Sequence, residues 1–318
     1  MRRATSVCLA VLLASAAVAD ARAGQQAGGG QGTTIIEQAP TDRSVAIPKE
    51  KLAQYLKDMD AKRLQTLRMV EGGKFNVNIR RITNAETALV HPNTIDLWVV
   101  LEGGGTLTAG GKLDNGKIVG GESYPLKVGD VAFVPAGVPH GVSGVDGNIT
   151  WLNVRWDVDW PANSELGAGR GRGAPPAAAG RSGRGGVEPI EYAPTDRAVY
   201  IPKEKLDAYR RDMDAKNVGT VRMVEGGHFN VNIRRVKAPS GELHPITIDT
   251  WVVLEGGGTV TSGFKTEGGT RVAGTGISVP AKVGDVFFVP ANLNHGFTAV
   301  NGVASWLNIR WDVNWAQR

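Results

Sequence analysis

The sequence predicts an all-β protein in which one domain is written twice, with one short helix per copy. Residues 39–82 and 193–236 align without gaps and share 32 of 44 positions, which indicates a duplication. Apolar and polar residues alternate with a period of two in stretches such as FNVNIRR, DLWVVLEG and ITWLNVRWDV. Gly and Pro separate these stretches, so each copy is expected to form a β-sandwich or a small barrel of short strands.

The N-terminal segment 1–23 has the layout of a secretory signal peptide. Two arginines precede a short apolar run, and Ala21-Arg22-Ala23 offers a cleavage site for a signal peptidase. The run is too short to span a bilayer. We therefore expect an exported protein, periplasmic or extracellular, without a membrane anchor. Residues 24–38, rich in Gly and Gln at their start, are expected to form a disordered N-terminus.

Cysteine use and charge exclude several classes of function. The chain's single cysteine, Cys8, lies in the leader, so the mature protein would have neither disulfides nor thiolate metal ligands. The net charge of +5 is accounted for by segments 1–24, at +2, and 162–187, at +3. The rest of the chain is neutral overall, so no nucleic-acid partner is expected.

A linker separates the two copies. Residues 162–187 consist largely of Gly, Ala, Pro and Arg, with almost nothing to bury. The first domain is accordingly assigned to residues 39–161 and the second to residues 188–318. At about 150 residues, each repeat is a whole domain rather than a unit of a solenoid.

A helix is expected near the start of each domain. Pro48 and Pro202 suit its first turn. Apolar side chains then recur with the spacing of one helical face, at Leu52, Tyr55, Leu56 and Met59 in the first copy and at Leu206, Tyr209 and Met213 in the second.

The same three ionisable side chains recur in both copies. A His and an Asp five residues apart precede a strand and a run of three glycines, and a second His follows in a turn rich in Gly and Pro. These residues are His91, Asp96 and His140 in the first copy and His244, Asp249 and His295 in the second. Two imidazoles and a carboxylate suit iron, manganese, zinc, copper or nickel, and three protein ligands leave coordination positions open.

The stretch that ends in the second His of each copy resembles the second sequence motif of the cupin superfamily. Its pattern of Gly, five residues, Pro-x-Gly, two residues and His is met in full at residues 129–140. In the second copy, residues 284–295 match except that Asn292 replaces the second Gly. The resemblance extends over roughly 70–158 and 223–313. It implies two double-stranded β-helix barrels in one chain, a layout shared with proteins related to oxalate decarboxylase and to seed storage proteins.

The first cupin motif fits in part. His91 and His244 take the place of its second His, and the Asp of each copy takes the place of its Glu. The first His of the motif is Leu89 in one copy and Glu242 in the other. The resemblance implies a metal ion in each barrel, with Glu242 as an additional ligand in the second; an exposed loop Glu is the alternative reading.

Strand parity gives candidates for a substrate pocket. Trp98 and Trp251 lie two residues after the Asp and share its face, so they line the pocket or belong to the core. Arg81 and Arg235 end an apolar strand face, where they either clamp a carboxylate at the cavity mouth or extend into solvent. By the same parity, Arg155 is expected to point outward from its strand.

The tryptophans also recur in pairs, and most are expected to pack between the barrels or between subunits of a homo-oligomer. The function expected is that of an exported metal-binding bicupin that acts as a metal-dependent enzyme on a small polar or carboxylate-bearing molecule. Dioxygenation, decarboxylation and isomerisation remain open, because fold does not fix function. The alternative is a non-catalytic metal-binding, ligand-binding or storage-like protein.

Overall fold

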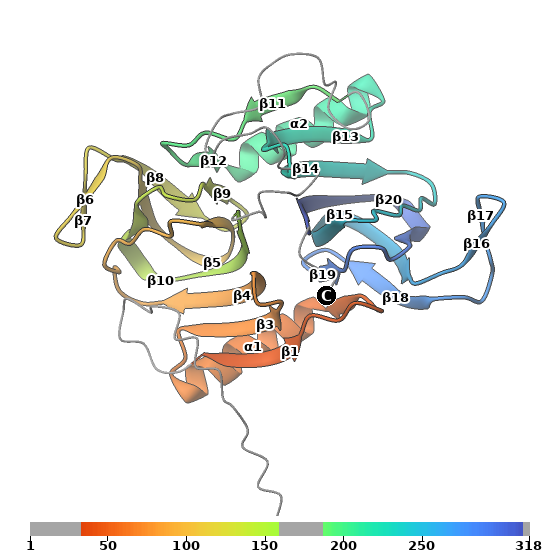
Figure 1. Ribbon diagram of the computed structural model, residues 1–318, viewed down its shortest axis with the longest axis horizontal. Coiled ribbons are helices and arrows are strands. Elements are labelled where there is room, and N and C mark those ends of the chain that lie inside the picture. The colour runs from red at the N-terminus through yellow and green to blue at the C-terminus, as the bar shows by residue number, and fades with distance from the viewer. Residues whose placement is uncertain (1–32, 159–186, 314–318) are drawn as a thin grey trace, which may run out of the picture.

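The computed structural model describes residues 33–158 and 187–313. The fold is dominated by two large sheets, one built mainly from each repeat, which lie side by side (Figure 1). This arrangement confirms the all-β class and the duplicated cupin architecture. The segments assigned to the signal peptide and the linker fall outside the described residues.

The first barrel is an eight-stranded sheet with the order β1-β3-β4-β10-β5-β9-β12, in which β8 also pairs with β5. Its strands from the first repeat are β1 (Thr34–Gln38), β3 (Thr66–Glu71), β4 (Phe75–Ile82), β5 (Thr94–Ala109), β8 (Glu122–Lys127), β9 (Val131–Val134) and β10 (His140–Asp157). A small hairpin of β6 (Lys112–Asp114) and β7 (Lys117–Val119) extends from it.

The second barrel repeats this order as β11-β13-β14-β20-β15-β19-β2, with β18 paired to β15. Its strands from the second repeat are β11 (Pro189–Tyr192), β13 (Thr220–Glu225), β14 (Phe229–Val236), β15 (Thr247–Ser262), β18 (Ile277–Lys282), β19 (Val286–Val289) and β20 (His295–Asp312). The corresponding hairpin is β16 (Thr266–Glu267) with β17 (Thr270–Arg271).

The two repeats exchange one strand. β2 (Val45–Ile47) of the first repeat pairs with β19, and β12 (Val199–Ile201) of the second repeat pairs with β9. Each barrel is therefore completed by the other repeat. The domain boundaries predicted from the sequence follow the repeats along the chain, whereas each sheet contains one strand from the other repeat.

A helix follows each exchanged strand, as the sequence predicts: α1 (Lys49–Lys62) and α2 (Lys203–Lys216). Neither proline that precedes these helices supplies a side-chain cap. Instead, the backbone N–H of Lys49 donates to Asp285 and that of Lys203 donates to Asp130, each at 2.8 Å. A buried carboxylate of each barrel thus caps the helix of the opposite repeat.

The glycine run after the tryptophan strand forms a bend inside one long strand. Gly103 has φ 66°, and a Cβ there would lie 1.9 Å from the carbonyl oxygen of Asn148. The pairing of β5 with β10 is irregular at this point. The bend lets β5 pair with β9 in its first half and with β8 in its second, which curves the sheet into a barrel.

The central strands of each barrel are buried on both faces over much of their length, as in β9 and in the second half of β10. One face points into its own barrel, where Trp98 and Trp151 pack with their rings 4.8 Å apart. The other face joins a core shared by both repeats, at whose centre Trp156 and Trp311 stack at 5.4 Å with an interplanar angle of 7°. Of the tryptophans expected between the barrels, Trp156 and Trp311 lie in the shared core, Trp151 and Trp306 lie inside their own barrels, and Trp160 and Trp315 fall outside the described residues.

The expectation of disorder over residues 24–38 was wrong at its C-terminal end. Thr34–Gln38 forms strand β1, which pairs in parallel with β3. The two adjacent apolar residues Ile35 and Ile36 were too short a signal to outweigh the Gly-rich residues before them. Neither helix in the described ranges is long and apolar enough to cross a membrane.

Candidate functional site

The three side chains singled out in the first repeat converge inside its barrel. The Oδ2 atom of Asp96 lies 3.7 Å from Nε2 of His91 and 3.5 Å from Nε2 of His140. One ligand atom from each residue lies within 4.8 Å of the other two. Asp96 and His140 are buried, whereas His91 is partly exposed, so the cluster is accessible from one side.

The second repeat brings its own three residues together in the same way. The Oδ2 atom of Asp249 lies 2.9 Å from Nε2 of His295 and 3.7 Å from Nε2 of His244. The two His rings are 5.4 Å apart in each barrel. The convergence predicted from the sequence is therefore present twice.

Backbone hydrogen bonds hold the histidines in place. Leu89 and His140 exchange two backbone bonds of 2.9 Å, and Gly137 N–H donates to the carbonyl of His91. In the second barrel Glu242 pairs with His295 in the same manner, and Asn292 N–H donates to His244.

The turn before the last histidine of each barrel needs a left-handed backbone. Gly137 has φ 82° and Asn292 has φ 61°. Asn tolerates this region better than other side chains do, which explains how the second copy departs from the Gly of the motif without losing the turn.

The ring orientation leaves Nε2 of each buried histidine directed at the carboxylate. Nδ1 of His140 lies 2.9 Å from the carbonyl of Val138, and Nδ1 of His295 lies 2.7 Å from that of Leu293. With Nδ1–H donating to these carbonyls, Nε2 is the nitrogen that can bind a cation once it carries no proton.

An arginine holds the other oxygen of each carboxylate. Nε of Arg155 lies 2.8 Å from Oδ1 of Asp96, and Nε of Arg310 lies 2.8 Å from Oδ1 of Asp249. The expectation that Arg155 points outward was wrong. Its half of β10 is buried on both faces, and the apolar face on which parity was based belongs to the shared core, so the polar face lies inside the barrel.

Burial and charge keep the cluster in a metal-binding protonation state. Burial alone would raise the pKa of Asp96, but Arg155 and His140 lower it well below its usual range. Burial lowers the pKa of His91 to about 4, with Arg155 contributing in the same direction. At neutral pH His91 is therefore a neutral imidazole beside an ionised carboxylate.

The second centre has the same carboxylate chemistry. The pKa of Asp249 is lowered to about 2, since Arg310 and His295 outweigh the effect of burial. Burial would lower the pKa of His295, but its bond to Asp249 raises the pKa above the ordinary value.

Glu242 lies beside the second centre, outside its set of three. Its Oε2 is 2.9 Å from Nε2 of His244, and its Oε1 forms an ion pair with Arg234. The side chain is 18% exposed, so it is not the free loop residue that was the alternative.

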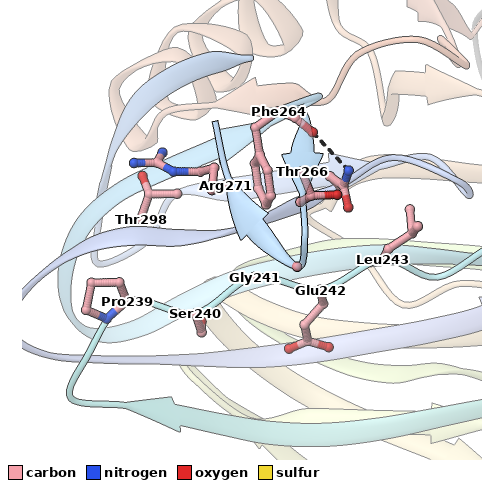
Figure 2. A pocket seen from close by; sticks show the side chains of 11 residues that line it. Pro239, Ser240, Gly241, Glu242, Leu243, Phe264, Thr266, Arg271 and Thr298 are labelled. Carbon is pink, nitrogen blue, oxygen red and sulfur yellow. Dashed lines mark hydrogen bonds between the residues drawn. The ribbon is translucent and has the colours of Figure 1, made fainter. Parts of the chain in front are cut away.

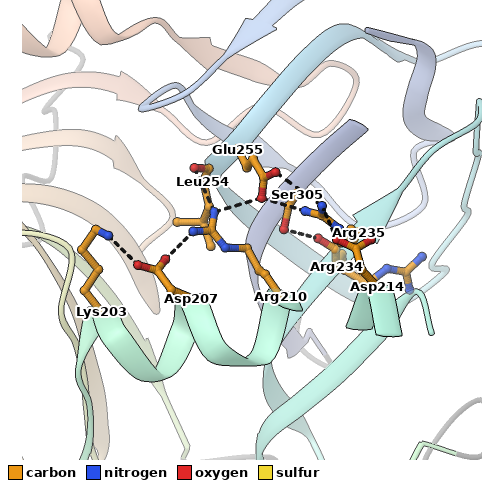
Figure 3. A network of polar contacts seen from close by, with 9 residues as sticks. All are labelled: Lys203, Asp207, Arg210, Asp214, Arg234, Arg235, Leu254, Glu255 and Ser305. Carbon is orange, nitrogen blue, oxygen red and sulfur yellow. Dashed lines mark hydrogen bonds and ion pairs between the residues drawn. The ribbon is translucent and has the colours of Figure 1, made fainter. Parts of the chain in front are cut away.

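Arg81 and Arg235 do not reach either centre. Arg81 pairs with Asp60 of α1 and with Glu102, and Arg235 pairs in the same way with Asp214 of α2 and with Glu255. Figure 3 shows this network around α2, on the outside of the barrel. The carboxylate clamp expected of these arginines was wrong, because their strand face belongs to the shared core and ends at the helix.

Trp98 and Trp251 lie next to the buried histidines, as their parity indicates. The ring of Trp98 is 6.0 Å from that of His140, and the ring of Trp251 is 5.4 Å from that of His295. Both are almost fully buried, in the cores of their barrels. They support the centres from inside the barrel.

A polar wall near the first centre was missed at the sequence level. The strand register places Asn76, Asn78 and Asn153 on the same inner face as Asp96 and Arg155. Asn78 and Asn153 are buried, and each has a carbonyl oxygen with no hydrogen-bond partner. The alternating FNVNIRR stretch carried the signal, but its asparagines looked like solvent-facing residues.

A cavity of about 480 Å³ adjoins the second centre. Figure 2 shows the segment 239–243 on one side of it, with Phe264 and Arg271 on the other. The carboxylate of Glu242 points away from Phe264, and its Oε2 contacts His244. The cavity therefore lies outside the cluster of His and Asp.

The donor set fits a divalent transition metal. Oδ2 of Asp96 is buried without a hydrogen-bond partner, and two imidazole nitrogens face it. Leaving a buried carboxylate oxygen unpaired is costly, and a cation would remove that cost. Two imidazoles and one carboxylate form a set typical of iron, manganese, zinc, copper or nickel.

Comparisons with known proteins agree with this architecture. Residues 83–154 match the family model described as a cupin domain. A salicylate 1,2-dioxygenase from Pseudaminobacter salicylatoxidans has a similar structure, with a TM-score of 0.55 and 13% identity over 86% of this chain and 84% of that one. The structure of the same enzyme with gentisate adducts has a TM-score of 0.53 and 14% identity, over 86% of this chain and 82% of that one.

A putative glyoxylate-induced protein from Pseudomonas aeruginosa aligns over 93% of this chain and 95% of its own, at 16% identity and a TM-score of 0.48. A search of curated proteins finds no match. At these identities the similarity to the solved structures concerns the fold.

Proposed function

Because the chain is a duplicated cupin, we propose that it is a metal-dependent enzyme that acts on a small carboxylate-bearing substrate. The observation that carries the proposal is the twofold convergence of two imidazoles and one buried carboxylate on a single point. His91, Asp96 and His140 would hold one ion. A metal ion bound there supplies Lewis-acid or oxygen-activating chemistry.

Arg155 supports a carboxylate-bearing substrate. Its Nε is fixed by Asp96, while its terminal nitrogens have no hydrogen-bond partner in the described part of the chain. The side chain is 21% exposed, so these nitrogens are accessible to a small molecule. A guanidinium whose two terminal NH2 groups are free can bind a carboxylate in a bidentate manner through both of them.

The asparagine wall would orient the rest of the substrate. Asn78 and Asn153 offer amide groups on the same inner face, directed into the barrel. Buried amides with unused acceptors select a ligand that donates hydrogen bonds, such as one with a hydroxyl group. A hydroxycarboxylate therefore matches the wall and the arginine together.

Among dioxygenation, decarboxylation and isomerisation, dioxygenation is the first reaction to test. The fold is shared with a salicylate dioxygenase, whose substrate is an aromatic hydroxycarboxylate. This likeness supports the choice of probe, and the argument for the substrate class rests on Arg155 and the asparagines.

The test is oxygen consumption by the purified protein loaded with Fe²⁺, using salicylate and gentisate as substrates. We expect uptake that depends on the metal and is lost in His140→Ala and in Arg155→Gln. If these acids bind but neither oxygen is consumed nor the acids are chemically changed, the result would favour a non-catalytic binding protein.

We also propose that the chain is exported, on the basis of its N-terminal segment 1–23. N-terminal sequencing of protein recovered from the producing cell's exported fraction should begin after Ala23. An intact Met1 in the recovered protein would contradict export by this route.

A further inference from the structure

We propose that the cavity beside the β16–β17 hairpin is a separate ligand site, which binds a small aromatic carboxylate outside both clusters of His and Asp. The inference goes beyond the proposed function and does not depend on a bound metal. It follows from three side chains that line this cavity and have no equivalent in the first repeat, namely Phe264, Arg271 and Asn294.

The first repeat closes the corresponding gap. There the N–H of Ala88 donates to the carbonyl of Gly116 at 3.1 Å, and a Cβ on Gly116 would lie 2.6 Å from the side chain of Thr87. The hairpin of the first repeat therefore packs directly on the loop that leads to its first histidine.

The second repeat leaves the gap open. Among the described residues, no backbone hydrogen bond joins residues 239–243 to the β16–β17 hairpin. The loop between the preceding strand and the first histidine is also one residue shorter, at 237–243 compared with 83–90. The result is the cavity of about 480 Å³, which has the size of a small-molecule site.

The hairpins differ in chemistry at equivalent places. The pairing of β6 with β7 sets Leu113 opposite Ile118, and the pairing of β16 with β17 sets Thr266 opposite Arg271. Two apolar side chains are thus replaced by a hydroxyl and a guanidinium. Both replacements line the cavity.

Arg271 supplies a positive charge that no neighbour balances. It is exposed, and within the described ranges it forms no ion pair; its Nη1 lies 3.5 Å from Oγ1 of Thr261. Glu242 is the one acidic residue among those that line the cavity, but it is paired with Arg234 and its carboxylate points away from Phe264 (Figure 2). A single guanidinium matches one carboxylate, which it can hold through two parallel hydrogen bonds.

Phe264 supplies a flat apolar surface beside this charge. Its ring centre lies 5.9 Å from the guanidinium carbon of Arg271. Phe264 is largely buried but still lines the cavity. An aromatic ligand can pack on such a ring.

The surroundings of Phe264 fix its position. The side-chain amide of Asn294 donates to the Phe264 carbonyl at 2.9 Å, a bond that Pro139 at the equivalent place in the first repeat lacks the group to make. On the opposite wall, a Cβ on Gly241 would lie 3.1 Å from the ring of Phe264. The absence of a side chain at Gly241 therefore leaves room beside the ring.

The cavity has a polar end and an apolar end. Figure 2 shows Arg271 and Thr298 together at one end and Leu243 at the other. Oγ1 of Thr298 lies 2.6 Å from that of Thr261, which also neighbours the guanidinium. Leu243 is 47% exposed. A carboxylate at the polar end with an aromatic body extending toward Leu243 matches this arrangement.

The test uses the full mature chain, isotope-labelled, stripped of metal and titrated with benzoate. The backbone amide NMR signals of residues 239–243 and 264–272 report on this cavity separately from Arg155. We expect these signals to shift and saturate with benzoate. Benzamide, which lacks the charge, and acetate, which lacks the ring, should each bind at least about tenfold more weakly.

Three variants isolate the cavity. Arg271→Gln should weaken benzoate binding at least about tenfold. Lys265→Gln is the matched control, since it removes the same charge from the same hairpin outside the cavity lining, and it should leave the affinity unchanged. Gly241→Leu fills the space beside Phe264 and should abolish the shifts. Thermal unfolding establishes that each variant is folded.

The outcomes are independent of the metal. Signals that do not respond to benzoate, or equal affinities for Arg271→Gln and Lys265→Gln, overturn this inference and leave the proposed metal-dependent function in place. Tighter binding of inorganic phosphate than of benzoate would also overturn it. A chain that binds benzoate in this cavity but holds no metal would contradict the proposed function alone.

Discussion

The two carboxylate oxygens of each buried aspartate have different neighbours: one faces an arginine and the other faces the histidines. Arg155 holds Oδ1 of Asp96, so Oδ2 alone is directed at the two histidines. Such a division fixes the orientation of the carboxylate before any cation arrives. The arginine also balances a negative charge that would otherwise be buried without a partner in the metal-free protein.

The first prediction concerns this pair. Arg155→Gln leaves Asp96 buried and unpaired, so the metal-free protein should lose roughly 3 kcal/mol of stability, with solvent at Arg155 placing the loss at the lower end of the range for buried pairs. A bound divalent cation replaces the lost charge, so Co²⁺ should restore most of the melting temperature. Thermal unfolding with and without Co²⁺ measures both effects; equal losses in the two conditions would count against the pairing.

The second prediction concerns the tryptophan behind the centre. Trp98→Ala removes a buried ring that packs against His140 and Trp151, and it should cost about 3–5 kcal/mol. Trp98→Phe, the matched control, keeps an aromatic ring and should cost clearly less. Denaturant titration compares the two. Similar and small losses would show that the ring contributes little to the core.

At the level of residues, the sequence was sufficient to find the three residues of each cluster but not the residues that contact them. The recurrence of His91, Asp96 and His140 at matching places predicted their convergence. Arg81 and Arg155 were assigned to the wrong sides, because a strand buried on both faces has no solvent face by which parity can be anchored.

The helices and the exchanged strands couple the two repeats. Asp130 accepts hydrogen bonds from Lys203 N–H, Lys127 N–H and the hydroxyl of Tyr200, each at 2.8 Å. Asp285 accepts the corresponding two backbone bonds, but Ala46 stands where Tyr200 stands in the other copy. The two aspartates therefore differ by one hydrogen bond, the one that Tyr200 donates to Asp130.

The third prediction uses this difference. Asp130→Ala removes a helix cap and a partly buried hydrogen bond from the Tyr200 hydroxyl and should cost about 2–3 kcal/mol, whereas Asp285→Ala should cost about 1–2 kcal/mol. Tyr200→Phe should account for the difference of about 1 kcal/mol. Melting temperatures of the three variants provide the measurement, and a larger loss for Asp285→Ala would refute the account.

The elements themselves were largely predictable. Helices α1 and α2 follow from the prolines and the apolar spacing. The exchange of β2 and β12 could not be predicted, because a three-residue strand carries no information about which of two similar sheets it joins.

For the whole molecule, the shared core makes the two barrels one unit. Phe75 packs against Phe288 and Phe133 packs against Phe229, beside the central stack of Trp156 on Trp311. With one strand and one helix cap also crossing in each direction, neither barrel is complete without the other repeat.

The fourth prediction follows from this. Cleavage at a protease site introduced into residues 162–187 should leave the halves associated, with an elution volume equal to that of the intact chain. The apolar area and the crossing strands hold them together without the linker. Expressed alone, either half should be unfolded or should pair with itself. Separation of the halves on a sizing column after cleavage would contradict the shared core.

The central claim is that His91, Asp96 and His140, and their counterparts in the second barrel, hold metal ions. Elemental analysis of the purified mature chain tests it most directly. The account predicts up to two transition-metal ions per chain, and near-complete loss in the folded double variant His140→Ala with His295→Ala. Unchanged metal content in that double variant would contradict the account.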